Sequence, residues 1–159
     1  MEKIKKFAKE ISVFGIVIIV VLALIVYKQF NPTNYTFINS QEAVSMFQSG
    51  EDFIVVFGTD TPTTTSSSSS TEQSSDPANL TAEQTAHVRQ YIKDHRQKVY
   101  YVDTDEIEDL STYFSDNFQT SSTLLPQTFF IKDGEIKLSK EGTIRYTEFG
   151  DLVNEWKNM

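Results

Sequence analysis

Three patterns of hydrophobic and polar residues follow one another along the chain, and the first is a continuous apolar run. Residues 11–27 read ISVFGIVIIVVLALIVY without a charged side chain. At 1.5 Å rise per residue, a helix of this length spans about 25 Å, which is close to the thickness of the hydrocarbon core of a bilayer. A helix that is apolar on every side would need a far larger protein to bury it. The pattern therefore predicts one N-terminal transmembrane helix over residues 11–27.

After a short turn-rich linker at residues 28–34, the pattern becomes that of a globular domain. Residues 35–38 have the β-branched and aromatic content of a small strand. The next apolar stripe has helical spacing, and we expect Ser40 to cap this helix and Gly50 to end it. Residues 53–57 (FIVVF) form a continuous apolar run, which is typical of a strand that is buried on both faces of a sheet.

A polar tract then interrupts this pattern. Nine consecutive hydroxyl residues run from Thr63 to Thr71. Such a tract buries too little apolar surface to offset the entropy lost on ordering, so we expect a disordered insertion at residues 61–79. An unmodified flexible loop is one interpretation of the tract. A displayed loop that carries O-glycans or phosphates is the other.

Regular patterns return after the insertion and complete a mixed α/β arrangement. Thr81 and Gln84 fit a capping box at the start of a helix. The order βαβ, insertion, αβα, ββα predicts a mixed sheet flanked by helices. In this half the expected elements are a helix from Thr81 to His95, a strand at 98–103, a helix from the acidic run 103–109 to Phe118, strands at 127–131 and 135–140 around the turn 133–134, and a helix at 146–157.

The C-terminal half contains the sequence LLPQTFFIKDGEI, in which an extended segment leads through a proline into a hairpin. This sequence and the order of elements from Tyr35 to Met159 resemble the thioredoxin fold. The resemblance implies a cis Leu125–Pro126 peptide bond, and a trans proline that merely starts a strand is the alternative. The Phe57-Gly58-Thr59 sequence is most similar to membrane-anchored thioredoxin-like proteins of Gram-positive bacteria, which include the bacteriocin transport accessory group.

The chain departs from that family at the position of the family's redox site. Matching the FIVVFG strand puts the two redox cysteines of the family near Pro62 and Thr65, but this chain has no cysteine. Hydroxyl groups stay protonated near neutral pH and cannot replace the thiolate that dithiol exchange requires. Val55 and Val56 occupy the part of the strand where many thioredoxins have an assisting carboxylate. The resemblance and this departure together imply a redox-inactive relative that is not an enzyme.

In thioredoxin-like proteins the segment before the cis-proline offers backbone groups to an extended peptide, and such a groove needs no cysteine. The resemblance therefore implies a peptide-binding groove in this chain. Its candidate residues are Thr61, Pro62, Thr65, Leu125 and Pro126. We expect that a charged residue in place of Leu125 would weaken partner binding without unfolding the domain.

Charge indicates the orientation of the chain and excludes one class of partner. The formal net charge is −8, with 14 Lys and Arg against 22 Asp and Glu, and this balance argues against nucleic-acid binding.

The lysines around the apolar run indicate its orientation. Four lysines lie in residues 1–10 and only Lys28 closely follows the apolar run. The positive-inside rule then places residues 1–10 in the cytoplasm and the domain at 35–159 outside the cell membrane. No A-x-A-like cleavage site follows, so we expect an uncleaved single-pass anchor.

No other constellation of residues predicts chemistry. His87 and His95 are too far apart on the expected helix to share a metal without further ligands. The acidic run 103–109 lacks the glycine and the terminal glutamate of an EF-hand loop. There is no nucleophile elbow or Ser-His-Asp set. We therefore expect no catalytic residues, no metal, no cofactor and no small-molecule substrate.

The sequence thus favours a membrane-anchored, extracytoplasmic accessory or scaffold protein that binds a membrane or secreted polypeptide. Three alternatives remain open. One is a role in thiol-disulfide exchange in which a partner chain supplies the cysteine. Another is a holdase-like chaperone for exported proteins. The third is a structural role in which the Ser/Thr tract is displayed as a modified surface loop.

Overall fold

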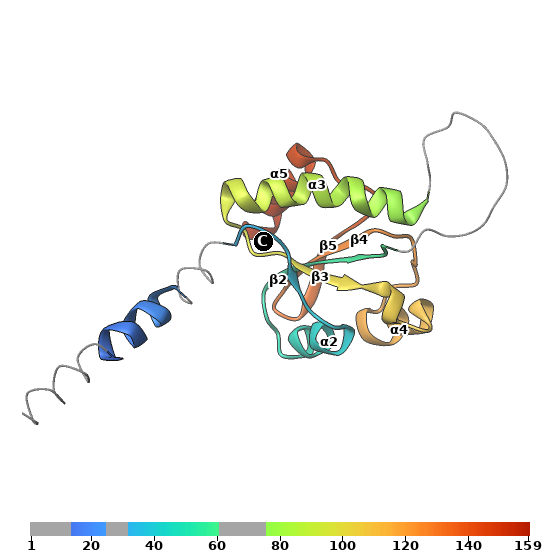
Figure 1. The fold of residues 1–159 in the computed structure, drawn as a ribbon. Helices are drawn as coiled ribbons and strands as arrows, with labels where there is room; N and C mark the ends of the chain where they lie inside the picture. Colours follow the sequence, from blue (N-terminus) through green and yellow to red (C-terminus); the bar gives the residue numbers. More distant parts are fainter. Residues whose placement is uncertain (1–13, 25–31, 61–75) are drawn as a thin grey trace, which may run out of the picture. The chain divides into compact units, whose positions relative to one another are not determined.

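The computed structural model describes residues 14–24, 32–60 and 76–159, in two compact units at residues 1–32 and 33–159 (Figure 1). In the first unit, residues 14–24 are helical and their large apolar side chains are exposed. No helix within the described ranges has both the length and the apolar content needed to span a bilayer. The remaining residues of the expected anchor, 11–13 and 25–27, lie outside the described residues, so the anchor stays a prediction.

The second unit is built on a five-stranded mixed sheet with the order β1-β3-β2-β4-β5. The parallel strands β1 (Thr36–Phe37), β3 (Tyr100–Asp103) and β2 (Phe53–Gly58) lie side by side. β4 (Gln127–Lys132) runs antiparallel to β2, and β5 (Glu135–Glu141) runs antiparallel to β4. Every residue of β2 is buried, as its continuous apolar run predicts. The predicted mixed sheet is therefore confirmed.

Two pairs of helices cover the two faces of the sheet (Figure 1). α3 (Pro77–His95) and α5 (Tyr146–Lys157) lie on one face, and α2 (Ser40–Gln48) and α4 (Leu110–Phe118) lie on the other. The buried apolar side chains divide accordingly into two clusters. The cluster under α2 and α4 is rich in phenylalanine, and the rings of Phe57 and Phe114 meet edge to face at 5.0 Å between centroids.

The start of α3 differs from the prediction in two ways. Asp76 caps the helix, because its carboxylate accepts a hydrogen bond from the backbone N–H of Ala78 at 3.0 Å, and Pro77 occupies the first turn. Residues 76–79 are thus a helix cap and a first turn. The prediction that the disordered insertion extends to residue 79 is therefore wrong. The predicted capping box is also wrong, because Thr81 and Gln84 lie inside the helix and are 1% and 0% exposed.

The starts of α2 and α4 also differ from the prediction. In both helices an Asn or Asp side chain, and not the expected residue, is the cap. Asn39, rather than Ser40, caps α2 and accepts from the N–H of Glu42 at 2.8 Å. The acidic run does not form one helix with residues 110–118. Asp103 caps a short 3₁₀ helix, η1 (Thr104–Glu106), and Asp109 caps α4 separately.

Candidate functional site

The candidate groove lies where the chain enters β4. The Leu125–Pro126 peptide bond is cis, which confirms the prediction. Pro126 is buried, and its carbonyl oxygen accepts a hydrogen bond from the N–H of Gly142 at 2.8 Å. This bond fixes the loop before β4 to the end of β5. Leu125 is partly buried and packs against the phenylalanine-rich cluster under α2 and α4.

Leu124 is the solvent-facing member of the leucine pair, with 64% of its surface exposed. Within the part of the chain that the structure describes, no hydrogen bond engages the backbone N–H or C=O of Leu125. An unpaired peptide group beside an exposed apolar side chain is suited to pairing with an extended polypeptide. The sequence LLP contains both leucines but gives no signal as to which one faces outward, so sequence reasoning missed Leu124.

Leu125 is partly buried, so a charged residue at this position would lie beside an apolar cluster. Contact with the cluster lowers the stability of a charged side chain. The prediction that such a change weakens binding and leaves the domain folded stays a prediction. Leu124 is the position at which the side chain can be changed while the cluster stays packed.

The carboxyl ends of β2 and β3 meet near this loop and are joined by side chains that the sequence analysis did not single out. The hydroxyl of Thr104 donates to the carbonyl oxygen of Gly58 at 3.0 Å, and the hydroxyl of Thr59 donates to the carboxylate of Asp105. The N–H of Thr59 approaches the hydroxyl oxygen of Thr81 at 3.4 Å. Three elements are thereby held together where β2 ends. The other candidate residues, Thr61, Pro62 and Thr65, lie outside the described residues.

Tyr101 is the buried titratable group of this region. Among the described residues its hydroxyl has no hydrogen-bond partner, and a Cβ atom on Gly58 would lie 2.9 Å from it. Burial raises the pKa of Tyr101 well above its ordinary range, and the nearby carboxylates of Asp60, Asp103 and Asp105 raise it further. The hydroxyl therefore stays protonated at neutral pH and is unsuited to act as a base or a nucleophile.

The described residues offer little else for catalysis. Val55 and Val56 are fully buried in β2, so the strand carries no carboxylate there. In residues 14–24, 32–60 and 76–159, no group of three or more His, Asp or Glu side chains could hold a metal ion. His95 instead bonds the hydroxyl of Tyr146 through Nε2 at 3.1 Å.

Neither a protein-family model nor a curated protein matches the chain in sequence. Solved structures do match it. Chloroplastic thioredoxin z is 20% identical with a TM-score of 0.50, and the match covers 79% of this chain and 96% of that one. A protein with a thioredoxin fold that was proposed to be an oxidoreductase is 14% identical with a TM-score of 0.51, over 72% of this chain and 91% of that one. At these identities the likeness shows the fold alone, and the domain of this chain has a thioredoxin-like fold.

Proposed function

We propose that the chain is a redox-inactive, membrane-anchored accessory protein whose extracytoplasmic domain binds an extended segment of a membrane or secreted polypeptide. The observation that carries this proposal is the edge before β4. There a cis Leu125–Pro126 bond and an exposed Leu124 occur together with a Leu125 backbone that makes no hydrogen bond to any described residue. A partner strand can pair with such a backbone and place an apolar side chain against Leu124.

The absence of cysteine from the whole sequence supports the redox-inactive part of the proposal. Thiol-disulfide exchange requires a thiolate, which this chain cannot supply. The apolar run 11–27 and the lysines before it support an anchor with a cytoplasmic N-terminus. We further propose that the chain is similar in role to the bacteriocin transport accessory group, because its sequence resembles that group around Phe57-Gly58-Thr59.

Site-specific photo-crosslinking of the full-length protein in its own membrane tests the binding site. A photoreactive amino acid replaces Leu124 at the proposed groove, and a second variant carries the same group at Asn154. Asn154 is an exposed residue of α5 on the opposite face of the sheet, so it is a matched control. We expect one dominant protein adduct from position 124 that is missing from position 154.

Each other outcome contradicts part of the proposal. The absence of an adduct at position 124, or identical adducts from both positions, would remove the groove as a binding site. Many unrelated unfolded clients would indicate a holdase instead of an accessory subunit. An insulin-reduction assay on the protein should show no activity, and activity that appears only with the captured partner would favour the oxidoreductase alternative.

A further inference from the structure

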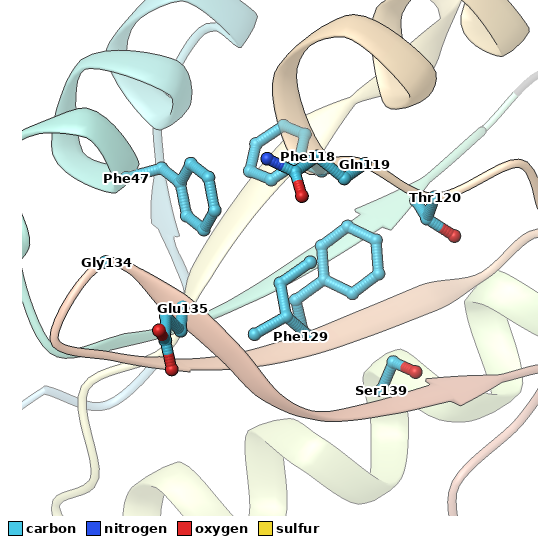
Figure 2. A pocket seen from close by; sticks show the side chains of 9 residues that line it. Phe47, Phe118, Gln119, Thr120, Phe129, Gly134, Glu135 and Ser139 are labelled. Atoms are coloured by element: carbon cyan, nitrogen blue, oxygen red, sulfur yellow. The ribbon is translucent and has the colours of Figure 1, made fainter.

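Glu141, the last residue of β5, lies on the face of the sheet that α2 and α4 cover. Phe129 and Ser139 are opposite one another in β4 and β5, and both line the same hollow beneath these two helices (Figure 2). Side chains alternate between the two faces of a strand, so the opposed pair Gln127 and Glu141, two positions further along, shares this face. Leu125 packs against the apolar cluster of the same face.

Glu141 is also close to the candidate groove along the strand. Gly142, which follows it, donates its backbone N–H to the carbonyl oxygen of Pro126 at 2.8 Å. Lys140, which precedes it, points to the other face of the sheet and pairs with Glu148 of α5 at 2.7 Å. Among the described residues no ion pair engages Glu141, and its side chain is exposed. One carboxylate therefore borders the groove on the side of β5.

Three more carboxylates lie on the other side of the groove, where β2 and β3 end. Asp103 ends β3 opposite the last residue of β2. Asp105 accepts a hydrogen bond from the hydroxyl of Thr59, and Asp60 is the next residue of the chain. Burial raises the pKa of Tyr101, and all three carboxylates raise it further. They therefore gather around one buried hydroxyl.

β2 separates these carboxylates from the groove by a short distance. The sheet order is β3-β2-β4, and neighbouring strands lie about 4.8 Å apart, so the backbone of Asp103 is about 10 Å from the start of β4. This distance is comparable with the Debye length of about 10 Å at 0.1 M ionic strength. The negative charge at the ends of β2 and β3 therefore acts on a segment bound at the groove.

The segments that build this end of the domain contain no basic residue. Residues 32–60 carry four carboxylates and residues 99–131 carry six, and neither segment contains Lys or Arg. Arg89 of α3 and Arg145, the N-cap of α5, belong to the helices on the other face of the sheet. The carboxylates beside the groove thus have no Lys or Arg of these segments to balance them.

We propose that the segment bound at the Leu124–Pro126 edge is basic, with a lysine or arginine on each side of the apolar residue that meets Leu124. This inference rests on the proposed function and names the chemistry of the partner at the same site. The cationic side chains would meet Glu141 on one side of the groove and Asp60 on the other, and such charge complementarity favours a specific partner. The carboxylates of the described residues form no group that could hold a metal ion, so charges spread along a polypeptide match them better than a single ion does.

Photo-crosslinking of peptides to the full-length protein in zwitterionic detergent micelles tests this proposal. A photoreactive amino acid in place of Leu124 reports only peptides that are bound at the groove. The first labelled peptide is Gly-Ser-Lys-Val-Lys-Ser-Gly, and in two further peptides glutamine or glutamate replaces both lysines. The yield of adduct against peptide concentration gives the apparent affinity of each peptide.

Two double variants carry equal changes of charge. Asp60→Asn with Glu141→Gln removes one exposed carboxylate from each side of the groove. Asp151→Asn with Glu155→Gln is the matched control, because it removes two exposed carboxylates from α5 on the other face of the sheet. Both double variants keep the size of every side chain that they change.

We expect the lysine peptide to bind at least tenfold more tightly than the glutamine peptide, and the glutamate peptide to bind most weakly. The preference for lysine over glutamine should fall at least fourfold in the groove variant and less than twofold in the control. Equal binding of the three peptides would overturn this proposal and leave the groove as a binding site. Equal losses in the two double variants would show attraction to net charge alone and would also overturn it. The absence of an adduct with any peptide would contradict the groove itself together with this proposal.

Discussion

Gln84 shows how one buried amide joins a helix, a strand and the loop before the last helix. Its Nε2 atom donates to the hydroxyl of Thr128 on β4 at 2.9 Å, and its Oε1 atom accepts from the N–H of Ile144 at 3.2 Å. Gln84→Leu would leave these buried partners without their hydrogen bonds, and we expect it to lower the free energy of unfolding by about 2 kcal/mol.

Urea denaturation followed through the fluorescence of Trp156, the single tryptophan of the chain, measures this change. The matched control is Gln90→Leu in the same helix, where the amide is exposed and bonds the exposed carboxylate of Asp94. We expect the control to change stability by less than about 0.5 kcal/mol. Equal effects of the two substitutions would contradict the role given to Gln84.

Three tyrosines predict a loss of stability at alkaline pH. Burial raises the pKa of Tyr35, Tyr101 and Tyr113 well above the ordinary tyrosine value of about 10. Above pH 10 the unfolded chain releases these protons while the folded domain retains them. Stability is therefore complete below about pH 10 and falls as the pH rises toward the raised folded-state values. Urea midpoints from far-UV circular dichroism at pH 8, 10 and 11 measure this decline.

Tyr101→Phe provides the control for the alkaline prediction. The variant keeps the ring and removes the group that titrates, so we expect its midpoint to fall less steeply above pH 10 than that of the unaltered protein. Identical slopes for the two proteins would show that other groups, and not Tyr101, cause the decline.

At the scale of elements, the end of β2 lies close against α3. A Cβ atom on Gly58 would lie 2.6 Å from the methyl carbon of Thr81. We expect Gly58→Ala to lower the free energy of unfolding by about 1–3 kcal/mol, because the two elements would have to separate. Thr81→Ser removes that methyl and keeps the hydroxyl oxygen near the N–H of Thr59. We expect the double variant to lose less free energy of unfolding than the sum of the losses in the two single variants. A double-mutant cycle measured by urea denaturation tests this, and strictly additive losses would contradict the contact.

Apolar periodicity was sufficient to predict the strands and α-helices of the domain, but not the short 3₁₀ helix η1. The run FIVVFG and the stripe of Phe149, Val153 and Trp156 are buried in the expected strand and helix. The turn at Asp133-Gly134 has positive φ at both residues, as this dipeptide favours. Local sequence could not decide between neighbouring capping residues, because Asn39, Asp76 and Asp109 compete with other Ser, Thr and Asp residues nearby.

The candidate site was predictable in part. The resemblance around LLPQ placed the cis peptide bond correctly at Leu125–Pro126. It could not reveal that Leu124 faces solvent, since both leucines precede the strand and only tertiary packing distinguishes them. The bonds of Thr59 and Asp105 were also beyond prediction. These residues are 46 positions apart and meet only because β2 and β3 are neighbours in the sheet.

For the whole molecule, the lack of native cysteine makes the predicted topology directly measurable. A single introduced cysteine is then the sole thiol of the chain. We expect Asn154→Cys to react with a membrane-impermeant maleimide in intact cells, and Glu2→Cys to react only after lysis. The reverse pattern would show the opposite orientation. Labelling of neither variant in intact cells, with both labelled after lysis, would place the whole chain inside the cell.

The short edge strand β1 is the part of the sheet that follows the N-terminal segment. It pairs with β3, and further bonds run from the N–H of Thr36 to the carbonyl of Val99 at 2.9 Å and from the N–H of Ile38 to the carbonyl of Tyr101 at 3.0 Å. A pull on that segment would reach the sheet first through β1. Because β1 has only two residues, we expect it to detach before the four remaining strands, which include the candidate groove at β4. Under such a load the candidate groove would keep its shape.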